Sequence, residues 1–107
     1  MYARMLEFTV KPERKAELIH LIRAEIIPGL NEQPGFVDAL LLEGDFALGR
    51  IIAISLWHSK ADAERLMLQF YPKIKEWIAP CLASPIVMRL YNVNTEVSSG
   101  MFSEMAC

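Results

Sequence analysis

The residues with the clearest chemical potential stand where an expected strand gives way to a helix. Trp57 ends an apolar run, His58 follows it, and Ser59 suits the N-cap of a helix. A tryptophan at this junction can form a stacking wall for a planar ligand, or it can fill the core. His58 lies near a helix N-terminus, which disfavours imidazolium, so it can act as a neutral base or be an exposed connector. Both interpretations stay open for both residues.

Two carboxylates, Glu7 and Asp38, lie inside apolar segments that resemble strands. A buried carboxylate with a raised pKa suits the abstraction of a proton from a phenol. The alternatives are an ion pair with Arg4, Arg50 or Arg89, or a solvated position at the edge of a sheet. Because the sequence does not decide between them, it assigns no general base.

Signatures of other chemistries are absent from the sequence. It contains no GxSxG motif, P-loop or dinucleotide fingerprint. His20 and His58 have no Cys, His or carboxylate partner at ligand spacing, so no metal site is predicted. His20 is expected on the wet side of the first helix. Met5, Met67 and Met88 can line an adaptable pocket, although methionine more often fills gaps in a core.

The elements that must position these residues follow the order βαββαβ. Alternation of side chains from Tyr2 to Val10 indicates a strand, and a helix starts at Lys11-Pro12-Glu13. We expect Pro28-Gly29 to kink or end this helix and Gln33-Pro34-Gly35 to stop it. The other expected elements are strands at 36–43, 50–57 and 85–96, a hairpin turn bracketed by Gly44-Asp45 and Gly49, and a helix capped by Ser59 and broken by Pro72. This order predicts an α+β, ferredoxin-like fold with a four-stranded antiparallel sheet.

Both faces of the expected sheet are apolar, which predicts a homodimer. In the segment 50–57, Ile51 and Ala53 fall on one face, whereas Ile52 and Ile54 fall on the other. Two helices can cover only one face of such a sheet, so the second face must be covered by another surface. The chain is also 53% hydrophobic, which is high for 107 residues. Two sheets packed face to face would form a dimeric α+β barrel.

Composition excludes several classes of function. The net charge is −2 and the 11 Lys and Arg are scattered, so there is no basic footprint for nucleic acid. The apolar runs are too short to cross a membrane, and no signal sequence is evident. Two cysteines without framework spacing favour a reducing, cytoplasmic setting. We expect one domain over residues 1–96 and a mobile C-terminal tail over 97–107.

Residues 2–96 resemble the antibiotic biosynthesis monooxygenase (ABM-type) domain of the dimeric α+β barrel superfamily. The resemblance depends on the element order, on the segment Gln33-Pro34-Gly35-Phe36 and on the segment from Leu56 to Ala63, in which a Trp closes a strand before a Ser-capped helix. It implies a cofactor-independent oxygenase that adds O2 to a small electron-rich aromatic such as a quinol or anthrone. In that chemistry the substrate supplies the electrons, and the protein binds it, favours its deprotonated form and excludes water.

The chain departs from the family's polar site residues at several positions. Ala53 and Ala63 stand where an anthrone oxygenase of this family has Asn and Tyr, and Leu6 and Lys75 replace the polar pair of the haem-degrading branch. We therefore expect no haem, metal or other cofactor. The alternative function is a non-catalytic small-molecule-binding or structural dimer on the same fold. The expected ligand-binding residues are Trp57, with its ring partly exposed in a cavity between the sheet and the second helix, and Phe70, Tyr91 and Arg4.

Overall fold

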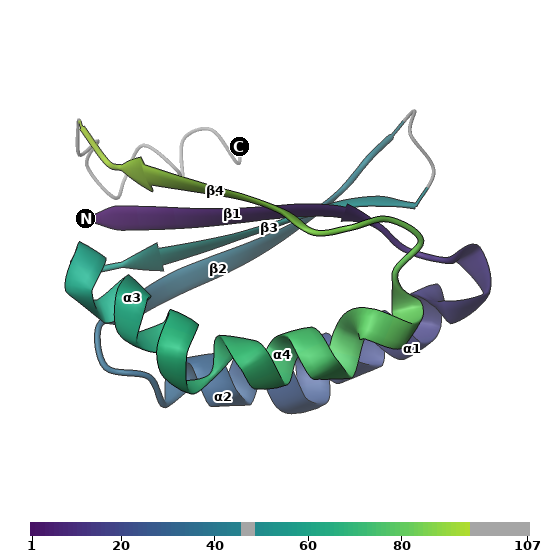
Figure 1. The fold of residues 1–107 in the computed structure, drawn as a ribbon, viewed down its shortest axis with the longest axis horizontal. Coiled ribbons are helices and arrows are strands. Elements are labelled where there is room, and N and C mark those ends of the chain that lie inside the picture. Colours follow the sequence, from purple (N-terminus) through teal and green to yellow (C-terminus); the bar gives the residue numbers. More distant parts are fainter. Residues whose placement is uncertain (46–48, 95–107) are drawn as a thin grey trace, which may run out of the picture.

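The chain forms a four-stranded antiparallel sheet with every described helix on one side of it (Figure 1). The computed structural model describes residues 1–45 and 49–94. The sheet order is β2-β3-β1-β4, which is that of the ferredoxin-like fold and confirms the predicted class. The strands are β1 (Tyr2–Thr9), β2 (Phe36–Glu43), β3 (Arg50–Trp57) and β4 (Val87–Asn92). Of the predicted bounds, only those of the fourth strand are clearly too long.

The sequence predicted that Pro28-Gly29 would either kink or end the first helical segment. The segment does not end there. It runs as a 3-10 helix (Pro12–Arg14), α1 (Lys15–Leu21), a π-helix (Ile22–Ile26) and α2 (Ile27–Asn31). Pro28 cannot donate a hydrogen bond to the carbonyl of Ala24, and its ring would crowd that carbonyl in a regular α-helix. The wider π-helical turn just before the proline relieves this crowding, and the chain stays helical to Asn31.

The second helical segment begins where the sequence predicts. Ser59 is the N-cap of α3 (Lys60–Gln69), and its Oγ accepts a hydrogen bond from the Asp62 backbone N–H at 3.2 Å. After α3, Pro72 lies in the first turn of α4 (Tyr71–Ile78), where its missing N–H costs nothing. A 3-10 helix (Ala79–Cys81) then leads towards β4. None of the described helices is long and apolar enough to span a membrane.

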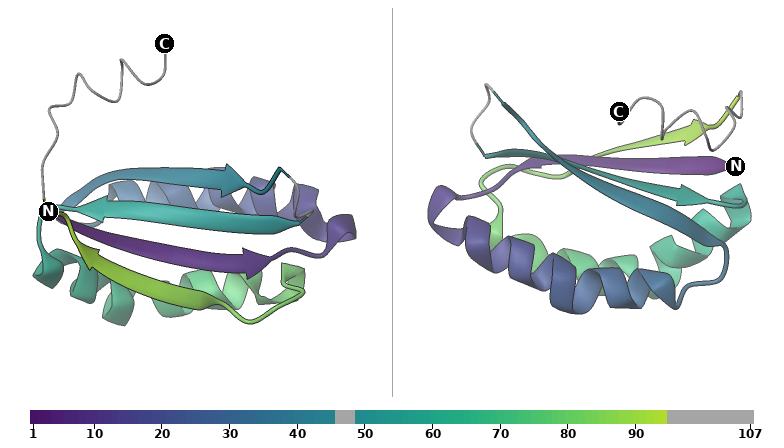
Figure 2. Two further views of the ribbon diagram at one scale, coloured as in Figure 1. Left: turned by 90° about the horizontal axis from the view of Figure 1, so that it is seen from above. Right: turned by 180° about the vertical axis from the view of Figure 1, so that it is seen from behind.

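Strand register divides the sheet into a helix-covered face and an open face (Figure 2). On the covered face, Tyr2 is paired with Trp57, Arg4 with Ser55 and Phe8 with Ile51. These residues form the core together with α1 to α4, and most of them are buried. The open face consists of the opposite side chains of the same strands, and its large exposed apolar residues include Leu40, Leu42, Val87 and Tyr91.

The predicted hairpin turn and the predicted tail fall partly or wholly outside the described residues. Gly49 has φ +80°, a conformation that favours glycine, and Gly44 donates its backbone N–H to the Arg50 carbonyl at 2.9 Å. These contacts agree with a turn between β2 and β3. The domain limit at residue 96 and the tail at 97–107 lie beyond the last described residue and stay predictions.

Candidate functional site

A cavity of about 110 Å³ lies between the covered face of the sheet and the helices. Residues of β1, β2 and β3 line it on one side, and residues of α1, the π-helix, α2, α3 and α4 line it on the other. The π-helical turn contributes Ile22 and Ile26 to this wall. The lining is apolar except for Arg4, Ser55 and Tyr71. A mostly apolar cavity with a few polar groups is the usual form of a small-molecule site.

Arg4 is the one charged residue that lines the cavity, and only 3% of its surface is exposed. Its Nη2 atom donates to the Met67 sulfur at 2.8 Å and lies 3.8 Å from the Met88 sulfur. The guanidinium carbon lies 4.9 Å from the centre of the Tyr71 ring, which is within cation–π distance. The buried Nε atom has no hydrogen-bond partner within the part of the chain that the structure describes. Arg4 therefore keeps an unused donor inside the protein.

Among the described residues, no carboxylate compensates this buried charge. None of the ion pairs within residues 1–45 and 49–94 includes Arg4. Desolvation lowers the pKa of the Arg4 guanidinium, although Tyr71 and Tyr2 oppose that shift. Arginine still stays protonated in proteins, so the site carries a positive charge at neutral pH. Burial also raises the pKa of Tyr71, which keeps its phenol neutral and excludes it as an anionic partner for Arg4 at that pH.

Trp57 does not occupy the position that the sequence suggested. Its exposed fraction is 0%, and it is not among the residues that line the cavity, so the expectation of a partly exposed ring is wrong. The Nε1–H of Trp57 donates to Ser55 Oγ at 3.0 Å. Its ring packs edge to face against Phe36, with the ring centres 5.4 Å apart. This satisfied, close-packed indole matches the core-filling interpretation.

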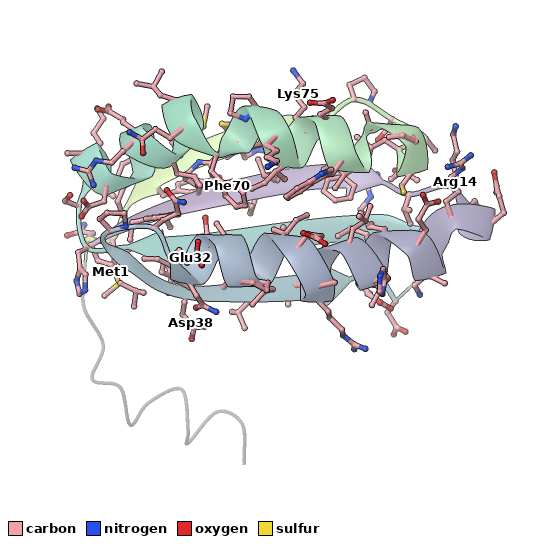
Figure 3. The ribbon with its side chains drawn as sticks, turned by 90° about the horizontal axis from the view of Figure 1, so that it is seen from below. Met1, Arg14, Glu32, Asp38, Phe70 and Lys75 are labelled. Atoms are coloured by element: carbon pink, nitrogen blue, oxygen red, sulfur yellow. The ribbon has the colours of Figure 1, made fainter. Side chains whose placement is uncertain are left out.

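Phe70 and Tyr91 also lie apart from the cavity lining. Phe70 lies between the two helical segments, as Figure 3 shows, and contacts Trp77 edge to face. It packs so closely on α2 that a side chain at Gly29 would overlap its ring. Tyr91 is 48% exposed, and its register opposite Ala3 puts it on the open face. Of the four ligand-binding residues predicted from sequence, only Arg4 lines the cavity; ligand contact by any of them stays a prediction.

The three candidate proton acceptors that the sequence offered also lie outside the cavity lining. Glu7 is on the open face, where it accepts from Arg50 at 2.7 Å and from Arg89 at 3.0 Å. This geometry matches the ion-pair interpretation of Glu7. Asp38 is exposed, and its Oδ1 accepts from the backbone N–H of Ala39 at 2.8 Å. His58 is an exposed connector, as its alternative interpretation stated.

The sequence of the chain matches the model of the antibiotic biosynthesis monooxygenase family over residues 1–67. This match covers more than half of the 107 residues. The chain belongs to the antibiotic biosynthesis monooxygenase family. The resemblance inferred from the strand–Trp–helix segment is thus confirmed. No protein of curated function matches the chain in sequence.

Solved structures of similar fold include several that are described as antibiotic biosynthesis monooxygenases. SnoaB, a cofactor-independent oxygenase from Streptomyces nogalater crystallised as the N63A mutant, superimposes with a TM-score of 0.73 at 24% identity, over 92% of this chain and 97% of its own. The ActVA-Orf6 monooxygenase of Streptomyces coelicolor, in complex with nanaomycin D, has a TM-score of 0.74 at 16% identity, over 90% and 89%. Rv0793 from Mycobacterium tuberculosis has a TM-score of 0.74 at 18% identity, over 91% and 98%. At these identities the likeness establishes the fold.

In this family member, Tyr71 is the site residue that sequence reasoning missed. It lines the cavity, contacts Arg4, and also lines a second hollow of about 430 Å³ between α4 and the start of β4. Met88, the more distant of the two sulfur neighbours of Arg4, lines that hollow as well. The available signal was the helical spacing of Tyr71, Ile74 and Ile78, all three of which are buried. Among the described residues, no group of three or more His, Cys, Asp or Glu could hold a metal ion.

Proposed function

We propose that this chain is a cofactor-independent monooxygenase that oxidises a small electron-rich aromatic, such as a quinol or an anthrone-like compound, with O2. The observation that carries the proposal is an apolar cavity that contains one buried cation. Apolar walls bind an aromatic ring and keep water away from it. The positive charge of Arg4 favours the ionised form of a phenol, which is the form that gives up electrons to O2 most readily.

The reaction balances without a cofactor. A hydroquinone and O2 give a hydroxyquinone and water: one oxygen atom enters a ring C–H bond and the other leaves as water. An anthrone CH2 group and O2 give a C=O group and water. In both cases the four electrons that O2 needs come from the substrate. The protein therefore has to bind the substrate, favour its ionised form and exclude water, which are tasks that side chains can perform.

Two of the similar structures support this assignment by what they are described to be. SnoaB is named a cofactor-independent oxygenase, and ActVA-Orf6 is a monooxygenase that was crystallised with the ligand nanaomycin D. The family match adds the same class of activity. These comparisons favour oxygenase chemistry, whereas the choice of an aromatic substrate is based on the apolar cavity of this chain.

We further propose that the working form is a homodimer joined through the open face. Leu40, Leu42, Val87 and Tyr91 are each close to half exposed there, and a row of exposed apolar side chains on a sheet is a surface that a partner covers. A second copy offers the same apolar surface, so a two-fold contact is self-complementary. A cytoplasmic setting is part of the same proposal, since Cys81 is a buried free thiol.

A non-catalytic binding module is the second candidate. The observation that favours it is that none of the described residues lining the cavity is a carboxylate or a histidine. A reaction that requires a protein base would have none in this cavity. Binding without oxygen consumption would identify this alternative.

Oxygen uptake tests the proposal. Chelator-treated protein without added flavin should consume O2 with a single-ring hydroquinone faster than the autoxidation rate measured with heat-denatured protein. Isotope-labelled O2 should place one labelled atom in the product. Ala53→Leu should abolish the uptake because Ala53 lines the cavity and the added atoms fill it. Ala24→Leu adds the same atoms at an exposed helical position and serves as the control. Uptake at the autoxidation rate, or uptake that survives Ala53→Leu, would refute the proposal.

A further inference from the structure

We infer that Arg4 is an anion-binding residue and that the ligand of the cavity is a single-ring aromatic anion that enters already ionised, with no proton acceptor supplied by the protein. This inference rests on the proposed function, which it deepens by giving the charge and size of the substrate. It is carried by the buried donor of Arg4 that lacks a partner, by the volume of the cavity and by the chemistry of the lining.

The present neighbours of Arg4 are poor substitutes for an anion. Thioether sulfur is a weak acceptor, and the guanidinium has five N–H donors to satisfy. The Met67 and Met88 sulfurs take up Nη2 only, and the Nε–H faces no acceptor. A buried guanidinium normally has a carboxylate or phosphate partner because desolvation of an unpaired charge is costly. A phenolate or carboxylate oxygen would accept from Arg4 and would neutralise its charge.

The cavity limits the ligand to one ring. An apolar cavity of about 150 Å³ in another protein accepts benzene. The cavity beside Arg4 has about 110 Å³, so a single ring is already at the upper limit of what it holds. Two fused rings exceed this volume, so of the two substrate types in the proposed function the single-ring quinol is retained and the three-ring anthrone is excluded.

The lining also determines where the proton goes. Arg4 is already protonated, Tyr71 is neutral and Ser55 accepts from Trp57, so none of these groups is suited to take up a proton at neutral pH. The phenol must therefore lose its proton to water or buffer before it binds. As a consequence, the pH dependence of binding follows the acidity of the ligand rather than a fixed protein group.

The experiment measures binding of a series of substituted phenols as a function of pH by isothermal titration calorimetry. The pH at which binding becomes half-maximal should move with the pKa of each phenol. For para-nitrophenol, the visible absorbance of the ionised form should show that the bound ligand is the phenolate. The neutral isostere para-nitrotoluene should bind wild-type protein at least roughly tenfold more weakly than the phenolate, as expected for the loss of a charge-assisted hydrogen bond.

Variants at position 4 distinguish the contribution of the Arg4 charge to binding from the contribution of the cavity's size. Arg4→Met should abolish phenolate binding while para-nitrotoluene still binds, and Arg4→Lys should keep part of the preference for the phenolate. A naphthol of matched acidity should bind at least tenfold more weakly than the single-ring phenol. A half-maximal pH that stays fixed across the series, equal binding of the neutral isostere, or undiminished phenolate binding by Arg4→Met would overturn the inference.

The two proposals fail separately. Phenolate binding that depends on Arg4, without oxygen uptake from hydroquinones, would refute the monooxygenase and support the anion site. Oxygen uptake that is unchanged in Arg4→Met would support the monooxygenase and refute the anion site.

Discussion

The arginines on the two faces of the sheet differ in their burial and in their ion pairs. On the open face, Arg50 and Arg89 are about half exposed, and both form ion pairs with Glu7. On the covered face, Arg4 is almost completely buried, and within the described part of the chain it has two sulfur atoms and an aromatic ring as neighbours but no carboxylate. The exposed charges are paired and the buried charge is not, which is the reverse of what stability alone favours.

This contrast separates a structural charge from one kept for a ligand. Solvent-exposed ion pairs are inexpensive and need no functional explanation. A buried, unpaired guanidinium costs free energy in the ligand-free protein, and such a cost is typical of binding and catalytic sites. Arg4 is therefore the stronger candidate for function, although Glu7 is the more conspicuous ionisable residue in the sequence.

The largest expected effect tests whether a second copy covers the open face. Leu42 is 45% exposed there, so Leu42→Asp should leave the monomer folded but should place an unpaired carboxylate in a dimer interface. Each buried charge costs several kcal/mol, so dimerisation should weaken by roughly a hundredfold or more. Light scattering after gel filtration should give about twice the chain mass of 12.2 kDa for wild type and about that mass for Leu42→Asp.

Leu68→Asp is the matched control, because Leu68 is 82% exposed on α3, away from the sheet. It should leave the dimer intact. A wild-type monomer at micromolar concentration, or equal dimerisation of wild type and Leu42→Asp, would contradict an interface on the open face.

The next effect compares the stability cost of the two kinds of arginine. Arg4→Met should raise the free energy of unfolding by about 1–4 kcal/mol, because an apolar side chain replaces an uncompensated buried charge. Arg89→Met should lower it, by about 1 kcal/mol or less in the monomer, because an exposed ion pair with Glu7 is lost. Urea denaturation measures both. The opposite signs are the decisive result, and a destabilised Arg4→Met would mean that Arg4 is structural.

The sequence predicts most of the secondary structure well because the starts and ends of these elements depend on local signals. Strands β2 and β3 have the predicted bounds, since glycines flank alternating or β-branched runs. Ser59 caps α3 because its side chain reaches an N–H only three residues away. The fourth strand is shorter than predicted because it pairs with β1 only over Val87–Asn92. The local pattern of 85–96 contains no information on where that pairing ends.

The site is less predictable because long-range packing creates it. Met67 and Met88 are 63 and 84 residues away from Arg4 along the chain, so no local motif connects them. One signal was available: Arg4 has the same parity as Leu6 and Phe8, and thus faces the core. The expectation that Trp57 lines the cavity was wrong because a tryptophan at the end of a strand gives the same sequence pattern whether it lines a cavity or fills the core.

The smallest expected effect tests whether Trp57 belongs to the core on the covered face. Ser55→Ala removes the acceptor of the Trp57 indole N–H and leaves a buried donor without a partner, so it should cost about 1–3 kcal/mol of stability. In a Trp57→Phe background the same substitution should cost much less, because the phenylalanine ring has no N–H to satisfy. Urea denaturation of wild type, both single variants and the double variant measures this coupling as a double-mutant cycle. A coupling near zero would place the indole N–H outside the structural core.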